Sequence, residues 1–357
     1  MSTAPVFITQ DPLADIDSMI AYYESLAGVT LAPAAAERLI LNTNAYHYSR
    51  LKAAIQDAAQ QNLVDFAQAP ALDYLGVYFG VVRLAPAGAT AAITFTLSGS
   101  PSAVTIPAGT RIATADGLVI FATTAAVVVP IANTTATATA ECLTLGSAGN
   151  DYAIGTVTDI LDPIPYLIAA TNTAITAGGS DAETDDQLRE RIKLAPGSFS
   201  VAGSRQAYRF WARSASALIC DVAVPDTLGD GVVNIYPLLT DGSSTSAGIL
   251  TAVEDACSSE TVRPLSDTVN AIAPTRTTFN LTAVVTPYIG YTVTVGEVED
   301  AIEAFITAKR QTLGNNIVDT QIFTVIHNAA PGQIFDVSLT AWTDITIAPT
   351  EFAVLNT

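Results

Sequence analysis

Basic residues are scarce in this chain, which has 15 lysines and arginines against 34 aspartates and glutamates in 357 residues, a formal net charge of -19. Nucleic-acid binding requires a basic footprint, and anionic membrane surfaces attract basic segments. We therefore expect no nucleic-acid partner and no docking on an anionic membrane. A basic protein partner remains compatible with the composition.

Cysteine and histidine are almost as rare. Cys142, Cys220 and Cys257 are odd in number, far apart and without a Cys-x-x-Cys spacing, so neither a disulfide framework nor a zinc site is predicted. Cys220 lies in an apolar run and is expected to be a small buried thiol. His47 and His327 have no cysteine or paired acid at ligand spacing. We expect no metal and no cofactor.

Motifs of common enzymes are missing too. The sequence has no Gly-x-Ser-x-Gly and no His-Glu-x-x-His, so it predicts neither an enzyme nor a small-molecule substrate. One alternative is a cell-wall hydrolase, for which paired carboxylates are required. The candidate pairs are Asp226 with Asp230, and Asp336 with Asp344.

Charged residues make up 14% and aromatic residues 7%, against roughly a quarter charged in ordinary domains. Thr, Ser and Ala must therefore cover much of the surface, as in a subunit that buries itself against partners. Residues 117–140 carry no charge, but Pro130, Asn133 and the many threonines favour strands over a membrane helix. The N-terminus has no basic and apolar signal pattern, so no secretory signal is expected.

Residues 1–85 are predicted to be helical. A first helix is expected over 15–26, ended by Gly28, and a longer one with Pro33 in its first turn. Apolar residues then recur at three- and four-residue steps and indicate one amphipathic helix. This stripe comprises Tyr48, Leu51, Ile55, Ala59, Leu63 and Phe66. Because two or three helices cannot bury such a stripe alone, we expect it to pack on the rest of the chain or on another chain. It is the predicted partner-binding face.

The rest of the chain changes character twice. Residues 86–176 are predicted to form a small antiparallel β domain, with strands at 92–97, 104–106, 111–113, 118–121 and 127–129. Residues 177–275 and 276–357 alternate helix and strand and are expected to form α+β sandwich units. Helices are predicted at 181–194, 203–214, 247–257, 295–309 and 321–328. Strands are predicted at 217–224, 232–239, 268–272, 278–285 and 334–339, with a hairpin turn at 229–231. The fold class is thus α+β multidomain.

The junction at 177–192 is the most informative segment. Its acids, Asp181, Glu183, Asp185 and Asp186, suit calcium or magnesium. Yet Ser180-x-x-Glu183 and Thr184-x-x-Gln187 both have the form of a helix capping box, and acids stabilise a helix N-terminus. We interpret the cluster as a cap, with Pro196-Gly197 after the helix. The glycines Gly178 and Gly179 suggest a flexible hinge for the β domain.

Several segments, in this order, resemble the baseplate J-like family. They are the Asp-Pro at 11–12, residues 23–28 and 31–33, residues 53–59, Leu-Asp-Tyr-Leu-Gly at 72–76, Gly-Val-Val-Arg at 80–83, Thr-Ile-Pro-Ala-Gly-Thr at 105–110, residues 178–189, and Gly-Ser at 203–204. The resemblance covers nearly the whole chain, although residues 276–357 match only in general pattern. The order and spacing of the motifs carry it.

The resemblance implies a mechanical role with no catalytic residues. The chain is expected to be a wedge subunit in the baseplate of a contractile phage tail or related injection system. Its partners would be a second J-like copy or related wedge subunit, a third wedge protein sharing the N-terminal helical bundle, and a sheath-initiator protein. Neighbouring wedges would complete a six-fold ring around the hub and transmit the trigger for sheath contraction. The expected location is the virion or particle baseplate, assembled in the host cytoplasm. A tail-associated adhesin, suggested by the Thr/Ala-rich strands, is the other alternative.

Overall fold

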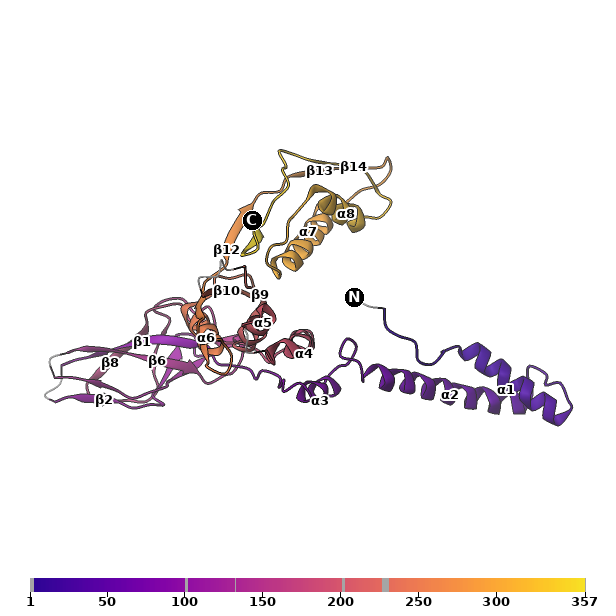
Figure 1. Cartoon of the computed structure of the whole chain (residues 1–357), viewed down its shortest axis with the longest axis horizontal. Helices are drawn as coiled ribbons and strands as arrows, with labels where there is room; N and C mark the ends of the chain where they lie inside the picture. Colours follow the sequence, from indigo (N-terminus) through magenta and orange to yellow (C-terminus); the bar gives the residue numbers. More distant parts are fainter. Residues whose placement is uncertain (1–2, 100–101, 132, 201–202, 227–230, 357) are drawn as a thin grey trace. The chain divides into compact units, whose positions relative to one another are not determined.

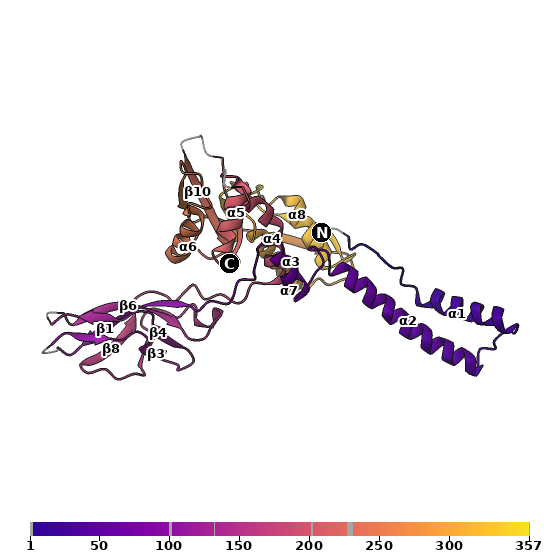
Figure 2. The same ribbon diagram turned by 60° about the horizontal axis from the view of Figure 1, so that its bottom comes forward.

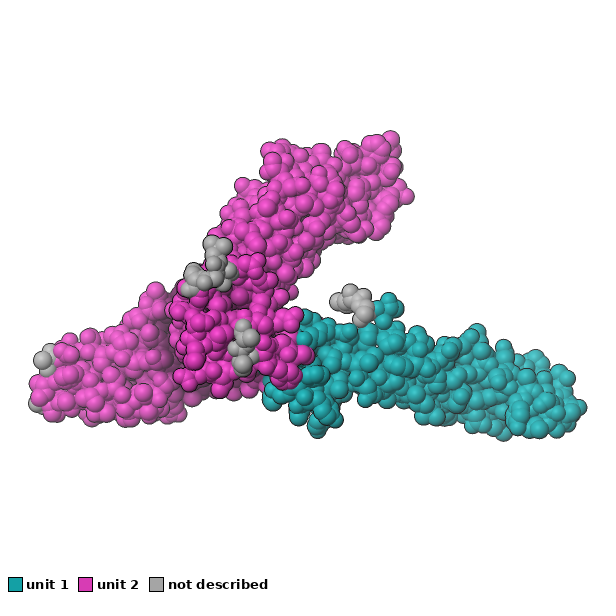
Figure 3. Space-filling view, viewed as in Figure 1, with its two compact units in different colours: residues 1–82, 188–193 teal, residues 83–187, 194–357 magenta. Residues whose placement is uncertain are grey.

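The computed structural model describes residues 3–99, 102–131, 133–200, 203–226 and 231–356 (Figure 1). The chain divides into two compact units (Figure 3). Unit 1 comprises Met1–Val82 with Leu188–Lys193, and unit 2 comprises Arg83–Gln187 with Leu194–Thr357. Within the described ranges, none of the helices has both the length and the apolarity to cross a membrane.

Unit 1 contains helices α1 (Pro12–Ala27), α2 (Ala36–Gln60) and α3 (Ala71–Val77). Asp11 caps α1 through its side chain, Pro12 occupies the first turn, and Gly28 ends the helix at a φ of 65°. Helices α1 and α2 lie side by side in both views (Figures 1 and 2) and form a helical hairpin. The predicted end at Gly28 is confirmed.

Two predictions about α2 are wrong. Pro33 lies before the helix, whose N-cap is Ala35, and the helix ends at Gln60. Leu63 and Phe66 therefore lie beyond α2, because the backbone after Gln60 turns: Leu63 N donates to Gln60 O, and Phe66 N to Leu63 O. The apolar periodicity of the sequence therefore extends beyond the end of the helix.

Unit 2 begins with an antiparallel β domain (Figure 2). Its six-stranded sheet has the order β7-β3-β4-β6-β1-β8, and β2 pairs separately with β5. The strands are β1 (Thr90–Leu97), β2 (Val104–Ile106), β3 (Arg111–Thr114), β4 (Ile120–Thr123), β5 (Val127–Val129), β6 (Thr135–Cys142), β7 (Val157–Ile160) and β8 (Leu167–Asn172), with a 3-10 turn η1 (Ser147–Gly149). The five predicted strands are confirmed, while β6, β7 and β8 were missed.

Alternation builds the core of this domain. Strand β1 buries every second residue, including Ile93, Phe95 and Leu97. Asn172, which is fully buried, connects the two edge strands. Its Oδ1 accepts hydrogen bonds from the backbone N–H groups of Gly155, Thr156 and Val157, each at 3.0 Å. A single amide thus joins β8 to the start of β7.

The next segment contains α4 (Asp185–Ser198), α5 (Arg205–Ser214), β9 (Ile219–Ala223), β10 (Val232–Leu239), α6 (Ala247–Ser258) and β11 (Thr268–Ala271). The sheet order is β11-β10-β9, parallel between β10 and β11 and antiparallel between β10 and β9. Helix α4 starts four residues later than predicted and includes Pro196, which was expected after the helix. Since proline has no N–H, the helix lacks the hydrogen bond from residue 196 to Ile192 O in its last turn. Residues 229 and 230 of the predicted hairpin turn lie outside the described residues.

The C-terminal segment contains β12 (Thr275–Phe279), β13 (Ala283–Pro287), α7 (Val295–Arg310), α8 (Asp319–Ala329), β14 (Ile334–Leu339) and β15 (Glu351–Leu355). The single strand predicted over 278–285 is wrong, because its halves take different partners. Strand β12 pairs with β15, and β13 pairs with β14. Strand β14 is not the last, since β15 follows it. The α+β multidomain class is confirmed, and the domain boundaries at 85, 176 and 275 stay predictions.

Candidate interaction surface

The helical hairpin is held together by polar side chains. Gln56 is buried, and its Oε1 accepts hydrogen bonds from the N–H groups of Phe7 at 2.8 Å and Ile8 at 3.1 Å, while its Nε2 donates to Pro5 O at 2.7 Å. Lys52 Nζ lies 2.6 Å from an Asp15 carboxylate oxygen of α1. That hydrogen bond raises the pKa of Lys52 above its usual value. Lys52 thus connects α2 to α1, and Gln56 connects α2 to the segment before α1.

The apolar face of α2 is left in solvent. The side chains of Tyr48, Leu51 and Ile55 are 43%, 56% and 46% exposed, and we call these three residues the α2 stripe. They are spaced three and four residues apart, so they lie on one face of the helix. An exposed set of large apolar side chains in register is typical of a protein interaction surface. The α2 stripe is the candidate interaction surface of this chain.

The predicted set of six is thus divided. Ala59, Leu63 and Phe66 are only half-buried and belong to the end of α2 and the loop that follows. Leu63 and Phe66 therefore do not continue the α2 stripe along one helix, and Ala59 adds only a methyl group to it. That all six residues bind a partner stays a prediction. Only three of the six are both exposed and part of α2, and these are the residues of the α2 stripe.

The acidic junction is occupied by contacts within the chain. The Glu183 side chain is buried and its Oε2 accepts from Leu84 N at 2.9 Å. Asp185 pairs with Arg83 at 2.7 Å, and Asp181 accepts hydrogen bonds from the N–H and hydroxyl of Ser147. Over the described residues, no group of three or more His, Cys, Asp or Glu side chains could hold a metal. Each of these three acids therefore has a structural contact.

Only one of the two predicted capping boxes forms. Thr184 is the N-cap of α4, with its hydroxyl accepting from Gln187 N and the Gln187 Oε1 accepting from Thr184 N at 3.0 Å. Ser180 does not cap a helix, because its backbone pairs with Ala87 in an antiparallel bridge. That pairing keeps the chain extended up to Glu183 and explains why α4 begins later than predicted.

Thr184→Ala is expected to destabilise the protein by about 0.5–2 kcal/mol, since it removes the acceptor for an N-terminal N–H of α4. Guanidinium denaturation followed by circular dichroism measures the change. Thr184→Ser is the matched control, because it keeps the hydroxyl and is expected to retain most of the stability. Equal losses in both variants would contradict the capping role.

An arginine and a lysine of the same helix contact the loop that follows α2 in unit 1. Arg189 donates from Nε to Val64 O and from Nη2 to Ala67 O, both at 2.8 Å. Lys193 pairs with Asp65 at 2.6 Å. These contacts fix the loop that follows α2 and satisfy two of its carbonyls. The sequence did not indicate these acceptors.

The glycine pair of the junction does not form a free linker. Thr90 N donates to Ala177 O at 2.8 Å, and Asn150 binds Gly179 twice, donating to its carbonyl and accepting from its N–H, both at 2.8 Å. The predicted hinge over Ala177 to Ser180 is therefore wrong. These residues are the closing segment of the β domain.

The structure shows the surroundings of three of the four hydrolase candidates. Asp226 pairs with Arg205, and Asp230 lies outside the described residues. Asp336 is exposed on β14, whereas Asp344 accepts hydrogen bonds from Asp319 N and the indole of Trp342. Cys142 and Cys257 are buried and Cys220 only half-buried, so the prediction for Cys220 is wrong. Burial raises the pKa of Cys220 to about 11 and that of Cys257 to about 12, so both thiols are protonated at neutral pH.

Two family models match consecutive parts of the chain. The baseplate J-like protein barrel domain matches residues 92–179, and the baseplate J-like central domain matches residues 200–273. Both matched regions are domains of the baseplate J-like family. The first match ends at Gly179, where the closing segment pairs with the β domain, and the second covers α5, the three-stranded sheet and α6.

Curated relatives agree with this family. The chain is 29% identical over 168 residues to the baseplate protein gp47 of Escherichia phage Mu, a match covering 47% of this chain and 45% of that protein. It is 30% identical over 149 residues to baseplate protein J of Escherichia phage P2, covering 41% and 48%. The match thus spans about half the length of each relative. A chain of the anti-feeding prophage baseplate structure aligns over 97% of this chain and 90% of its own at a TM-score of 0.44 and 14% identity.

Proposed function

We propose that this J-like protein is a structural, non-catalytic subunit of the baseplate of a contractile tail or a related injection particle. The observation that carries the proposal is the succession of a J-like barrel domain and a J-like central domain in one chain. The curated relatives, which are baseplate proteins of two phages, support it. The corresponding location is the baseplate of the virion tail or particle, and assembly takes place in the host cytoplasm.

The finer proposal is a wedge subunit. In this role the α2 stripe packs in a helical bundle with a second J-like copy or a related wedge subunit, and with a third wedge protein. The support is the exposure of Tyr48, Leu51 and Ile55 on a helix that already contacts α1 through a salt bridge. Burial of such a stripe against partner helices stabilises a bundle through the hydrophobic effect.

Neighbouring wedges and a sheath-initiator protein complete the proposed set of partners. Joined into a six-fold ring around the hub, the wedges transmit the trigger for sheath contraction as rigid bodies that repack at their interfaces. The scarcity of charge, 14% of all residues, supports extensive burial of surface in such an assembly.

Native mass spectrometry of the chain co-expressed with the products of its neighbouring genes tests the proposal. The expected result is a hetero-complex with two J-like copies and one further subunit. Deletion of residues 1–85 is expected to abolish this complex. A lone monomer, or a homotrimer that binds cells by itself, would replace the wedge with the adhesin alternative.

A further inference from the structure

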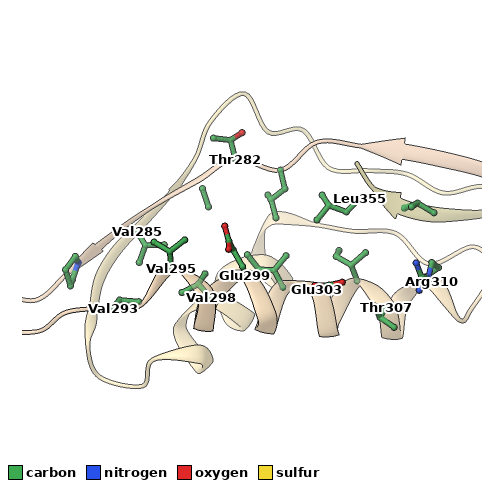
Figure 4. Close-up of a pocket in the computed structure, with 16 residues that line it drawn as sticks. Thr282, Val285, Val293, Val295, Val298, Glu299, Glu303, Thr307, Arg310 and Leu355 are labelled. Atoms are coloured by element: carbon green, nitrogen blue, oxygen red, sulfur yellow. The ribbon is translucent and has the colours of Figure 1, made fainter. Parts of the chain in front are cut away.

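A groove of about 700 Å³ opens between helix α7 and strand β13 in the C-terminal segment (Figure 4). Alternate residues of β13, namely Ala283, Val285 and Pro287, line one wall. Val298 and Ile302 of α7 line the other. The volume lies within the range of sites that bury a ligand or a set of large side chains. Most of the lining is aliphatic, so an occupant must present apolar groups.

The groove also has an acidic side. Glu299 and Glu303 lie one turn apart on α7 and line the groove, and the Glu299 side chain rises from the helix toward the strand that carries Val285 (Figure 4). Neither carboxylate has a hydrogen bond or ion pair with another described residue. Arg310 also lines the groove, but it lies seven residues beyond Glu303, about 10 Å along the helix.

These two acids are not explained by helix stability. The helix dipole stabilises acids within the first turn, where α7 has Glu297. Glu299 and Glu303 lie further along, and like charges four residues apart destabilise a helix by about 0.2–0.5 kcal/mol. A cation placed between them would relieve this repulsion. Their position beside an apolar groove therefore indicates a partner that is both apolar and basic.

Exposed apolar residues extend the surface beyond the groove. Pro287 is followed by Tyr288 and Ile289, which are 48% and 104% exposed, and the ring of Tyr288 contacts that of Phe335 at 5.4 Å. Val295, which lines the groove, is 69% exposed. Exposed apolar side chains that continue beyond the groove favour a polypeptide occupant.

We propose that this groove, formed by α7 and β13, is a docking site for a basic amphipathic segment of a different protein. Its apolar face packs against Val285, Val298 and Ile302, and its lysines or arginines pair with Glu299 and Glu303. A second copy of this chain is a poor occupant, because its own net charge is -19. The site is separate from the α2 stripe and goes beyond the proposed function.

Fluorescence anisotropy with a labelled synthetic peptide tests the docking site on the full chain alone. The probe is a helix-forming peptide of leucine and lysine, with leucines at a period of 3.6 residues. The comparison peptide has glutamate in place of every lysine. The basic peptide is expected to bind. The double substitution Glu299→Gln, Glu303→Gln is expected to lower the affinity for this peptide about tenfold, which is about 1.4 kcal/mol of binding free energy. Hydrogen exchange is expected to slow at β13 and α7 when the basic peptide is added.

Glu297→Gln with Asp300→Gln is the matched control, since it removes the same charge from the same helix outside the groove lining. This variant is expected to bind like the unchanged chain. An equal loss of peptide affinity in both variants would mean that overall charge causes the effect, and it would overturn the proposal. Failure of the basic peptide to bind would also overturn it. A concentration-dependent dimer in sedimentation, lost in the Glu299→Gln, Glu303→Gln variant, would instead assign the groove to a second copy.

Discussion

Substitution of Leu51 and Ile55 by glutamate is expected to abolish the hetero-complex with the neighbouring baseplate proteins. Both side chains are about half exposed, so the free chain should fold as before. In a bundle the two carboxylates would lie in an apolar contact without cations, where burial of an unpaired charge is costly. Central apolar residues of an interface often contribute 2 kcal/mol or more each, so we expect affinity to fall by at least about a hundredfold.

Native mass spectrometry and size-exclusion chromatography of the co-expressed proteins measure this loss. Tyr46→Glu with Ala53→Glu is the matched control, because it also places two acids on exposed positions of α2. Ala53 is two residues from Leu51 and so about 200° around the helix. The control is expected to assemble and to keep the same thermal midpoint as the Leu51→Glu, Ile55→Glu variant. Assembly of both variants would remove the α2 stripe from the interface.

Gly179→Ala is expected to destabilise the β domain by about 1–3 kcal/mol, because overpacking a well-packed site typically costs this much. A Cβ at Gly179 would lie 2.4 Å from Gly146 O, 2.9 Å from Asn150 Oδ1 and 3.0 Å from Ala89 N. Two of these three atoms belong to backbone and cannot move away cheaply. The clash also displaces Asn150, which donates to and accepts from Gly179.

Chemical denaturation measures this change, with Gly248→Ala as the control. Gly248 lies in α6, and a Cβ there would meet nothing within 4 Å. Alanine in a helix is expected to stabilise by about 0.4–1 kcal/mol, through the lower entropy of the unfolded chain. The two glycine-to-alanine replacements should therefore change the free energy of unfolding in opposite directions. An unchanged stability of Gly179→Ala would restore the interpretation of this segment as a loose linker.

Much of the fold could be predicted from residues that are close together in the sequence. Strands β1 to β5 followed from short β-branched runs between turn residues, and α6 and α7 from apolar periodicity. Gly28 and the Thr184-x-x-Gln187 box fixed helix ends, because each is satisfied by atoms within a few residues. The family resemblance likewise depended on the order of short motifs, and two family models bear it out.

Long-range contacts decided the rest. The pairing of Ser180 with Ala87 delayed α4, and the different partners of β12 and β13 divided one predicted strand into two. For the candidate surface, the sequence determined that α2 has an apolar stripe, but it did not specify which face α1 covers. In the structure Lys52 contacts Asp15 of α1, Gln56 binds the segment before α1, and Leu51 is left in solvent. A hydrophobic pattern specifies which residues gain from burial, whereas the identity of the surface that buries them depends on residues distant in the chain or on another protein.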